Sequence, residues 1–175
     1  DRLPGDDARR YRVRMNGINA ASPVSLGEVT PKNIRAILRL QVKAEQSRFV
    51  ANNATSLAEA YVYPDRAWPR AIHAGETPVG FVMLDLVGPD HPQAPQGKAS
   101  YFLWRLMVDA EHQGRGYGAA AMRLVLDPIK TLPQGDALAT SYVPGDGSPV
   151  RFYEKLGFEP TGEVDDDEIV LRLAW

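Results

Sequence analysis

Three glycines within five residues, Gly114, Gly116 and Gly118, stand in the stretch QGRGYG between an apolar run and a helical pattern. A glycine-rich turn at a helix N-terminus exposes backbone N–H groups, and the helix dipole there favours negative charge. The missing side chains let oxygen atoms approach the backbone closely. A tight turn without a ligand is the alternative, but three closely spaced glycines exceed what a turn requires. The stretch therefore predicts a phosphate-binding loop.

The surroundings of the glycines narrow the kind of phosphate ligand. A P-loop ends in Gly-Lys-Ser or Gly-Lys-Thr, which this stretch lacks. The segment GRGYGA does fit the permissive dinucleotide fingerprint G-x-G-x-x-A. However, too few residues follow Gly118 for the rest of a doubly wound domain, and no strand-ending acid follows about 20 residues later. The context therefore argues against a Rossmann site.

A second motif lies near the C-terminus, in RFYEKLGF, residues 151–158. Together with QGRGYG it resembles the signatures of the GNAT superfamily of acyl-CoA N-acetyltransferases, which are a Q/R-x-x-G-x-G/A pyrophosphate loop and a helix with a tyrosine before Leu-Gly-Phe. The resemblance covers residues 23–175. Within the superfamily, QSRFV and the FYEKLGF…GEV ending look most like bacterial polyamine (spermine/spermidine-type) acetyltransferases.

The resemblance implies acetyl-CoA as the cofactor and a particular way of holding it. The strand at residues 106–108 is expected to splay from its neighbour at 137–143, so that the pantetheine arm pairs with exposed backbone. The N–H of Val108 is the expected oxyanion donor. Arg115 either adds a charged contact to phosphate or is a solvated loop side chain. The expected cofactor-binding residues are Leu106, Met107, Val108, Gln113, Gly114, Arg115, Gly116, Tyr117, Gly118 and Ala119.

Tyr153 matches the general acid of the family. The acetyl group passes directly from thioester to amine, which agrees with the absence of cysteine. A tyrosine with a reference pKa of about 10 can donate to a thiolate whose conjugate acid has a pKa of about 8.5. Periodicity alone would make Tyr153 a half-buried aromatic side chain. Seven residues earlier the family often has a cofactor-binding asparagine, but Asp146 cannot donate that hydrogen bond.

The general base is harder to place by resemblance. Trp104 stands where eukaryotic polyamine acetyltransferases carry a glutamate. The candidates are Asp85, Glu45 and Glu59, or a water molecule, although each carboxylate could equally be a solvated side chain. Asp85 is the first choice because it interrupts an otherwise apolar strand.

The acceptor side of the site is expected in EAYVYPDRAW, between the helical region and the first hairpin. Aromatic and acidic side chains suit an ammonium group through cation–π and ion-pair contacts, but they would equally form core and rim. The acidic run at 165–167 is expected to be a solvated turn. The three histidines lack metal-ligand spacing, so no metal site is assigned. The expected substrate-binding residues are Glu59, Tyr61, Tyr63 and Trp68.

Hydrophobic periodicity predicts the elements that must position these residues. Residues 1–22 are expected to be a flexible extension and 23–175 a single domain, a mixed α/β GNAT fold with six to seven mostly antiparallel strands flanked by helices. Capping patterns place helix starts at Thr30, Ser56 and Ser148. The expected strands are 23–29, 70–74, 79–88, 99–109, 137–143, 159–164 and 169–175, and the expected helices are 32–42, 44–53, 56–63, 116–132 and 149–156.

Composition limits the class of protein. The net charge of −2, from 20 Lys and Arg against 22 Asp and Glu, argues against general nucleic-acid binding. Without cysteine there is no disulfide and no thiolate metal site. No apolar run reaches the ~20 residues of a membrane span, and the charged start lacks a signal-peptide core, so a cytoplasmic protein is expected.

The sequence thus predicts an N-acetyltransferase that acts on a primary amine of a small molecule, such as a polyamine or an amine-bearing antibiotic. Two alternatives stay open: an acetyltransferase for protein N-termini or lysines, and an acyl-CoA-binding regulatory module without turnover. Dimers are frequent in the family, and the segment 169–175 could supply an interface strand.

Overall fold

The protein forms one seven-stranded sheet in the order β1-β2-β3-β4-β5-β7-β6, in a computed structural model that describes residues 24–132 and 134–175. Every neighbouring pair is antiparallel except β4 and β5, which are parallel. The predicted mixed sheet is confirmed, while the predicted extension lies outside the described residues. The strands are β1 Val24–Glu28, β2 Ala67–Ala74, β3 Thr77–Val87, β4 Ser100–Val108, β5 Ala137–Tyr142, β6 Glu159–Asp165 and β7 Glu168–Ala174.

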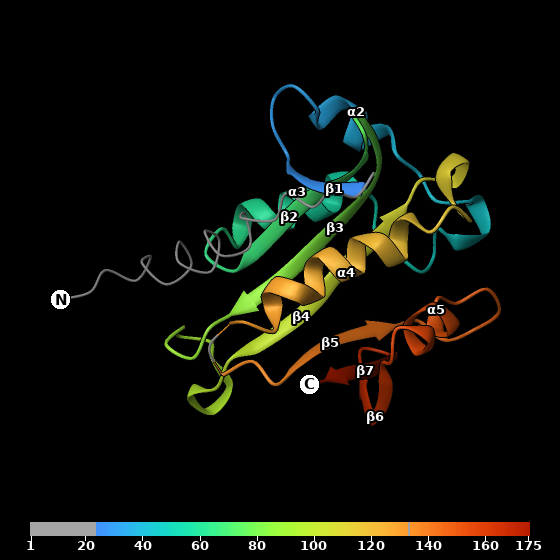
Figure 1. The fold of residues 1–175 in the computed structure, drawn as a ribbon. Coiled ribbons are helices and arrows are strands. Elements are labelled where there is room, and N and C mark those ends of the chain that lie inside the picture. The colour runs from blue at the N-terminus through green and yellow to red at the C-terminus, as the bar shows by residue number, and fades with distance from the viewer. Residues whose placement is uncertain (1–23, 133) are drawn as a thin grey trace.

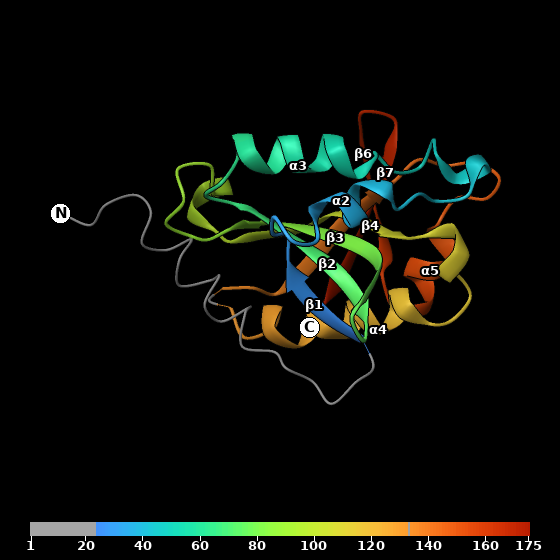
Figure 2. The ribbon, with the colours of Figure 1, turned by 90° about the horizontal axis from the view of Figure 1, so that it is seen from above.

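Helices cover both faces of the sheet, as Figure 2 shows. The helices α2 and α3 lie on one face and α4 lies on the other. A short helix, α5, follows β5 at one end. Within the described residues the helices are α2 Ile34–Arg39, α3 Asn53–Val62, α4 Tyr117–Ile129 and α5 Val150–Lys155, and the 3₁₀ turns are Ala44–Gln46, Pro95–Gly97 and Ala110–His112.

The inner strand β3 is covered on both faces of the sheet, which explains why its sequence is a nearly continuous apolar run. Successive side chains of a strand point to opposite faces. Phe81 and Met83 therefore pack in the core under α2 and α3, whereas Val82 and Leu84 pack in the larger core against α4. All four side chains are fully buried. None of the helices in 24–132 and 134–175 has the length and apolarity that crossing a bilayer requires.

The first helical region is shorter than its sequence pattern predicts. Residues 31–33 form a turn, and α2 begins at Ile34, because the side chain of Asn33 accepts a hydrogen bond from the backbone N–H of Thr30 at 2.7 Å. Thr30 is therefore not the cap. The predicted helix over 44–53 is wrong, since it contains only the 3₁₀ turn Ala44–Gln46 and Asn53, the first residue of α3.

Two further helix starts differ from prediction. Asn52 caps α3 by accepting from the N–H of Thr55 at 2.9 Å, so the helix begins three residues before Ser56. Ser56 is fully buried inside the helix and donates back to the carbonyl of Asn52. At α5 the N-cap position is held by Pro149 rather than Ser148. These misses share a cause, since several cap-forming residues compete along each segment and tertiary packing selects one.

Candidate active site

Strands β4 and β5 separate along their length. They share one ladder position, Phe102↔Ala139, although each strand continues well beyond it. Figure 1 shows the two strands diverging toward the end of the sheet at which α5 lies. A parallel pair that stops pairing leaves backbone N–H and C=O groups without strand partners along the gap.

The ladder between β3 and β4 decides which backbone groups face this gap. Val108 lies opposite Gly80, and the next N–H, that of Asp109, donates to the carbonyl of Val79 at 2.9 Å. Because antiparallel ladders alternate, the N–H and C=O of Val108 point away from β3 and into the gap. The same holds for Leu106, two residues earlier. The N–H of Val108, which is the expected oxyanion donor, therefore points into the gap.

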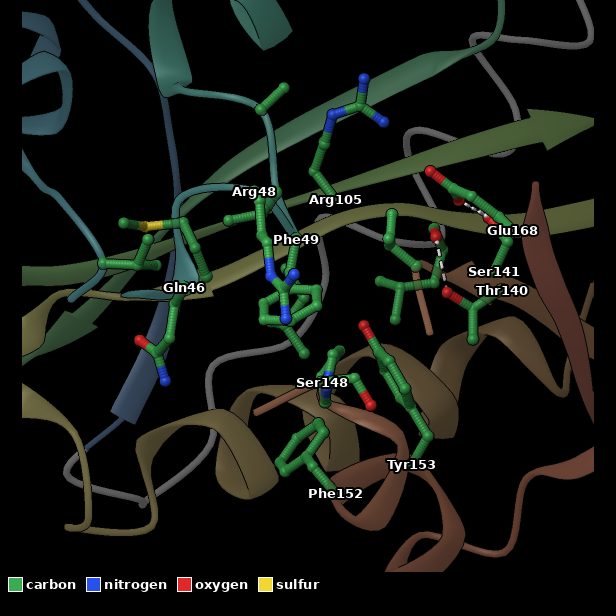
Figure 3. Close-up of a pocket in the computed structure, with 18 of the residues that line it drawn as sticks. Gln46, Arg48, Phe49, Arg105, Thr140, Ser141, Ser148, Phe152, Tyr153 and Glu168 are labelled. Carbon is green, nitrogen blue, oxygen red and sulfur yellow. Dashed lines mark hydrogen bonds between the residues drawn. The ribbon is translucent and has the colours of Figure 1, made fainter. Parts of the chain in front are cut away.

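A cavity of about 750 Å³ occupies the gap and its surroundings. Its walls come from β4 and β5, the segment before α3, the start of α4, the loop into α5, and the final hairpin. Figure 3 shows Tyr153, Phe49, Thr140 and Glu168 around it. The lining residues are Val42, 46–51, 102–108, Gln113, Gly118, Thr140, Ser141, Val143, 147–149, Phe152, Tyr153, Asp165, Asp166 and Glu168.

The glycine loop lies beside the cavity and has the geometry of an anion site. Gly114 and Gly116 have φ values of 76° and 80°, a left-handed conformation that other residues adopt at a cost. Ala120 donates the first backbone bond of α4, to Gly116 at 3.0 Å, so the preceding first-turn amides have no partner within the helix. A Cβ on Gly118 would meet the ring of Phe152 at 3.4 Å. The loop therefore fits the diphosphate for which its sequence was singled out.

Gln113 connects the loop to the gap. Its side-chain amide donates to the carbonyl of Val108 at 3.0 Å and to the side-chain oxygen of Gln46 at 2.7 Å. The first bond occupies a backbone acceptor that faces the gap, while the N–H of Val108 stays available. Gln113 thus ties the end of β4, the loop and the segment before α3 into one wall.

Tyr153 reaches the cavity from α5 and is 7% exposed. Its ring packs edge-on against Phe152 and Phe158 at centroid distances of 5.5 and 5.7 Å. Burial raises the pKa of Tyr153 to about 12, with the charge of Glu168 adding to the rise and the hydrogen bond with Thr140 opposing it. The phenol therefore keeps its proton at neutral pH, so its O–H can act as a proton donor in the cavity.

Comparison with known proteins identifies this arrangement. The model of the acetyltransferase (GNAT) family matches residues 34–158, which is most of the chain. The chain belongs to the GNAT family. It is an acetyl-CoA-dependent acetyltransferase, and the sequence prediction of this family and cofactor is confirmed.

The relatives of this acetyltransferase differ in their acceptors. The spermine/spermidine N(1)-acetyltransferase of Bacillus subtilis strain 168 is 24% identical over 147 residues, covering 81% of this chain and 91% of that protein. Aminoglycoside acetyltransferase AAC(6')-Ib in complex with coenzyme A has a TM-score of 0.67 at 16% identity, covering 86% and 94% of the two chains. Arabidopsis thaliana Naa50 with the bisubstrate analogue CoA-Ac-MVNAL has a TM-score of 0.62 at 20% identity, covering 88% and 100%.

The structure brings about half of the expected cofactor residues to the acetyltransferase cavity. Leu106, Met107, Val108, Gln113 and Gly118 line it, as does Tyr153. The others belong to the loop beside it, where backbone N–H groups are the expected ligand donors, and Arg115 is exposed. The expected loop residues that do not line the cavity are Gly114, Arg115, Gly116, Tyr117 and Ala119.

Asp85 is not at the cavity. Its carboxylate forms a two-point ion pair with the guanidinium of Arg66, including a bond from Nε at 2.6 Å, and its side chain is 13% exposed. The expectation that Asp85 faces the cleft therefore does not match its placement. On the ladder, Asp85 lies between Ala67 and Phe102, and its side chain is turned toward the arginine that precedes β2.

The expected acceptor residues are also away from the cavity lining. Glu59 accepts hydrogen bonds from Arg105 at 3.0 and 3.2 Å, which leaves it paired beside the cavity rather than in it. Tyr61 is 85% exposed, whereas Trp68 is 1% exposed in the core under α4. Tyr63 stacks at a tilt on Trp104, with ring centroids 6.0 Å apart.

Sequence reasoning missed several polar residues that line the cavity. Glu168 directly follows the acidic run 165–167, which the sequence predicts to be a solvated turn, and Thr140 and Ser141 fall within a predicted strand. Arg48 was also missed. It donates to the backbone carbonyl of Asp146 at 2.9 Å and joins two walls of the cavity. A polar Thr-Ser pair in an otherwise apolar strand was the one available signal.

Proposed function

We propose that this acetyltransferase moves an acetyl group from acetyl-CoA to a primary amine of a small polycation, a polyamine. The observation that carries the proposal is the cavity itself, in which one buried phenol faces carboxylates of the final hairpin. Those carboxylates are Asp165, Asp166 and Glu168. Negative groups at the acceptor end favour an ammonium-bearing substrate over a neutral or anionic one. The named activity of the Bacillus subtilis relative supports the same acceptor class.

When bound, acetyl-CoA supplies the activated acetyl thioester, and the residues of this chain position it. The first-turn amides of α4 and the glycine loop hold the diphosphate, aided by the helix dipole. The gap-facing backbone of Leu106 and Val108 binds the arm that carries the acetyl group. The N–H of Val108 donates to the acetyl oxygen as negative charge develops there, a contribution of about 3 kcal/mol in comparable sites.

Tyr153 acts at the sulfur. Its side chain is buried, and its raised pKa keeps the phenol protonated at neutral pH. Figure 3 shows the phenol oxygen directed into the cavity. As the carbon–sulfur bond breaks, Tyr153 donates its proton to the departing sulfur, which would otherwise leave as a thiolate. No residue of the chain becomes acylated, because the amine attacks the thioester directly.

The part of the cavity wall formed by Arg48 and Phe49 favours a small acceptor over a peptide. Arg48 spans from the segment before α3 to the carbonyl of Asp146 in the loop before α5. Phe49 packs against this arginine, with the guanidinium carbon of Arg48 4.5 Å from the centroid of the Phe49 ring. A Cβ on Gly147 would lie 3.8 Å from the same ring. An extended peptide would have to displace this contact, whereas a flexible polyamine chain enters beside it.

The experiment is a thiol-release assay with acetyl-CoA and a panel of amines: spermidine, spermine, putrescine, an aminoglycoside and a lysine peptide. The chain contains no cysteine, so the thiol reagent reports coenzyme A alone. We expect the highest kcat/KM with a polyamine. A higher value for the peptide or the aminoglycoside would refute the polyamine assignment. Calorimetric binding of acetyl-CoA without turnover of any amine would instead indicate a regulatory module.

A further inference from the structure

Glu168 begins β7, directly after the turn of the final hairpin, and lines the cavity. Its carboxylate accepts a hydrogen bond from the hydroxyl of Ser141 on β5, drawn as a dashed line in Figure 3. The pairing of β5 with β7 fixes this contact, because Ser141 lies opposite Val170 and Tyr142 opposite Ile169. One carboxylate oxygen is thereby held, and the other is left to face the cavity.

The same carboxylate is coupled to the phenol of Tyr153. Its negative charge is one of the causes that raise the pKa of Tyr153. Thr140, the residue before Ser141, hydrogen-bonds to Tyr153 and donates its own hydroxyl to the carbonyl of Leu103 at 3.1 Å. Two consecutive residues of β5 therefore hold an acid and a carboxylate at one end of the same cavity.

Other carboxylates near the site are less suited to receive a proton from the acceptor. Asp165 and Asp166 also line the cavity, but both are exposed. Glu59 and Asp85 are paired with arginines, and Glu45 is exposed and does not line the cavity. Among the described residues that line it, Glu168 is the carboxylate that is partly buried and held by a strand hydroxyl.

We propose that Glu168 is the catalytic proton acceptor for the amine and that Ser141 is its positioning residue. This inference rests on the proposed function and adds to it the residue that generates the nucleophile. Trp104 stands on β4 where eukaryotic polyamine acetyltransferases carry a glutamate. We therefore assign the role of proton acceptor to a residue of β7.

The proton balance of the step is complete with these groups. Glu168 removes one proton from the acceptor ammonium, and the neutral amine attacks the acetyl carbon. A carbon–nitrogen bond forms and the carbon–sulfur bond breaks. The departing sulfur gains a proton from Tyr153. The nitrogen loses its second proton as the amide forms, and this proton returns to the phenolate of Tyr153. Glu168 then passes its proton on to solvent, which regenerates the carboxylate for the next turnover.

The charged groups around Glu168 are consistent with this role. Asp165 and Asp166 reach the cavity from the hairpin, and their charges attract the ammonium. Arg105, on β4, lines the opposite wall, where its guanidinium is held by Glu59 and the carbonyl of Trp104. The positive charge of Arg105 is thus partly neutralised before it can compete with the ammonium for Glu168.

The test compares Glu168→Gln with Asp167→Asn, a matched control that removes one charge from the same turn at a residue that does not line the cavity. Each is assayed with the best amine of the panel and with methoxyamine, a nucleophile that is already neutral at the assay pH. We expect Glu168→Gln to lower kcat/KM for the protonated amine about 10²-fold or more and to change that for methoxyamine less than about threefold. Asp167→Asn should change neither value more than about threefold.

Ser141→Ala keeps the carboxylate and removes its anchor. We expect kcat for the protonated amine to fall about tenfold with KM nearly unchanged, and Ser141→Thr to restore it. Equal losses for both nucleophiles, or no loss in Glu168→Gln, would overturn the assignment while leaving the proposed function intact. A wild-type protein that releases no thiol with any amine refutes the proposed function itself, and with it this inference.

Discussion

Replacement of Tyr153 by phenylalanine tests the proposed acid most directly. The substitution removes one oxygen from a side chain that is 7% exposed and leaves its ring contacts with Phe152 and Phe158 in place. The lost hydrogen bond with Thr140 should lower the free energy of unfolding by about 1 kcal/mol. The loss of the proton donor should lower kcat about 10²-fold or more.

The pH dependence gives the same substitution a second readout. The pKa of Tyr153 is about 12 in the folded protein, against a reference value of about 10. Between these values the folded protein binds the proton that the unfolded chain has lost, so stability falls as the pH rises from about 10 to about 12. The full pKa shift corresponds to about 3 kcal/mol of unfolding free energy, which the wild-type protein loses across this pH range. Tyr153→Phe lacks the phenol and should not show this loss.

The assays are steady-state thiol release, calorimetry with acetyl-CoA, and urea unfolding at pH 9 and pH 11. Tyr142→Phe is the matched control, because Tyr142 is partly buried on β5 and does not line the cavity. Tyr153→Phe should bind acetyl-CoA with a Kd within about threefold of wild type. An unchanged kcat would refute the role of the phenol as the acid. If the wild-type protein and Tyr153→Phe lose the same free energy of unfolding between pH 9 and pH 11, the raised pKa of Tyr153 is refuted.

Three further substitutions separate binding from folding. Gly118→Ala should raise the Kd for acetyl-CoA about tenfold or more. The melting temperature should stay unchanged, since a Cβ at this position meets protein atoms only at 3.4 Å or beyond. Unchanged affinity by calorimetry would contradict the loop assignment. Gly116→Ala should lower the free energy of unfolding by about 1 kcal/mol because of its φ of 80°, and urea denaturation checks this. Asp85→Asn should lower it by about 1–2 kcal/mol through the lost pair with Arg66 while kcat stays within about twofold; a collapse of kcat at unchanged stability would make Asp85 catalytic.

The features that the sequence determined by itself are local ones. The three glycines predict an anion-binding turn because left-handed backbone and close approach are properties of single residues, and Gly114 and Gly116 do have positive φ. The apolar run of β3 and the alternation of the final hairpin predict strands because their period follows from backbone geometry. Tyr153 reaches the cavity because a helix follows β5, which its flanking motif also predicts.

Tertiary structure alone decided which polar groups meet. Ser141 and Glu168 come together because β7 pairs with β5, and no local pattern states that register. Asp85 has the sequence of a candidate base, but the fold pairs its carboxylate with Arg66, away from the cavity lining. A carboxylate has the same local signal whether it ends in solvent, in an ion pair or in a cavity. Its chemistry is therefore set by the partner that the fold places within hydrogen-bonding distance, which depends on contacts between residues far apart in the chain.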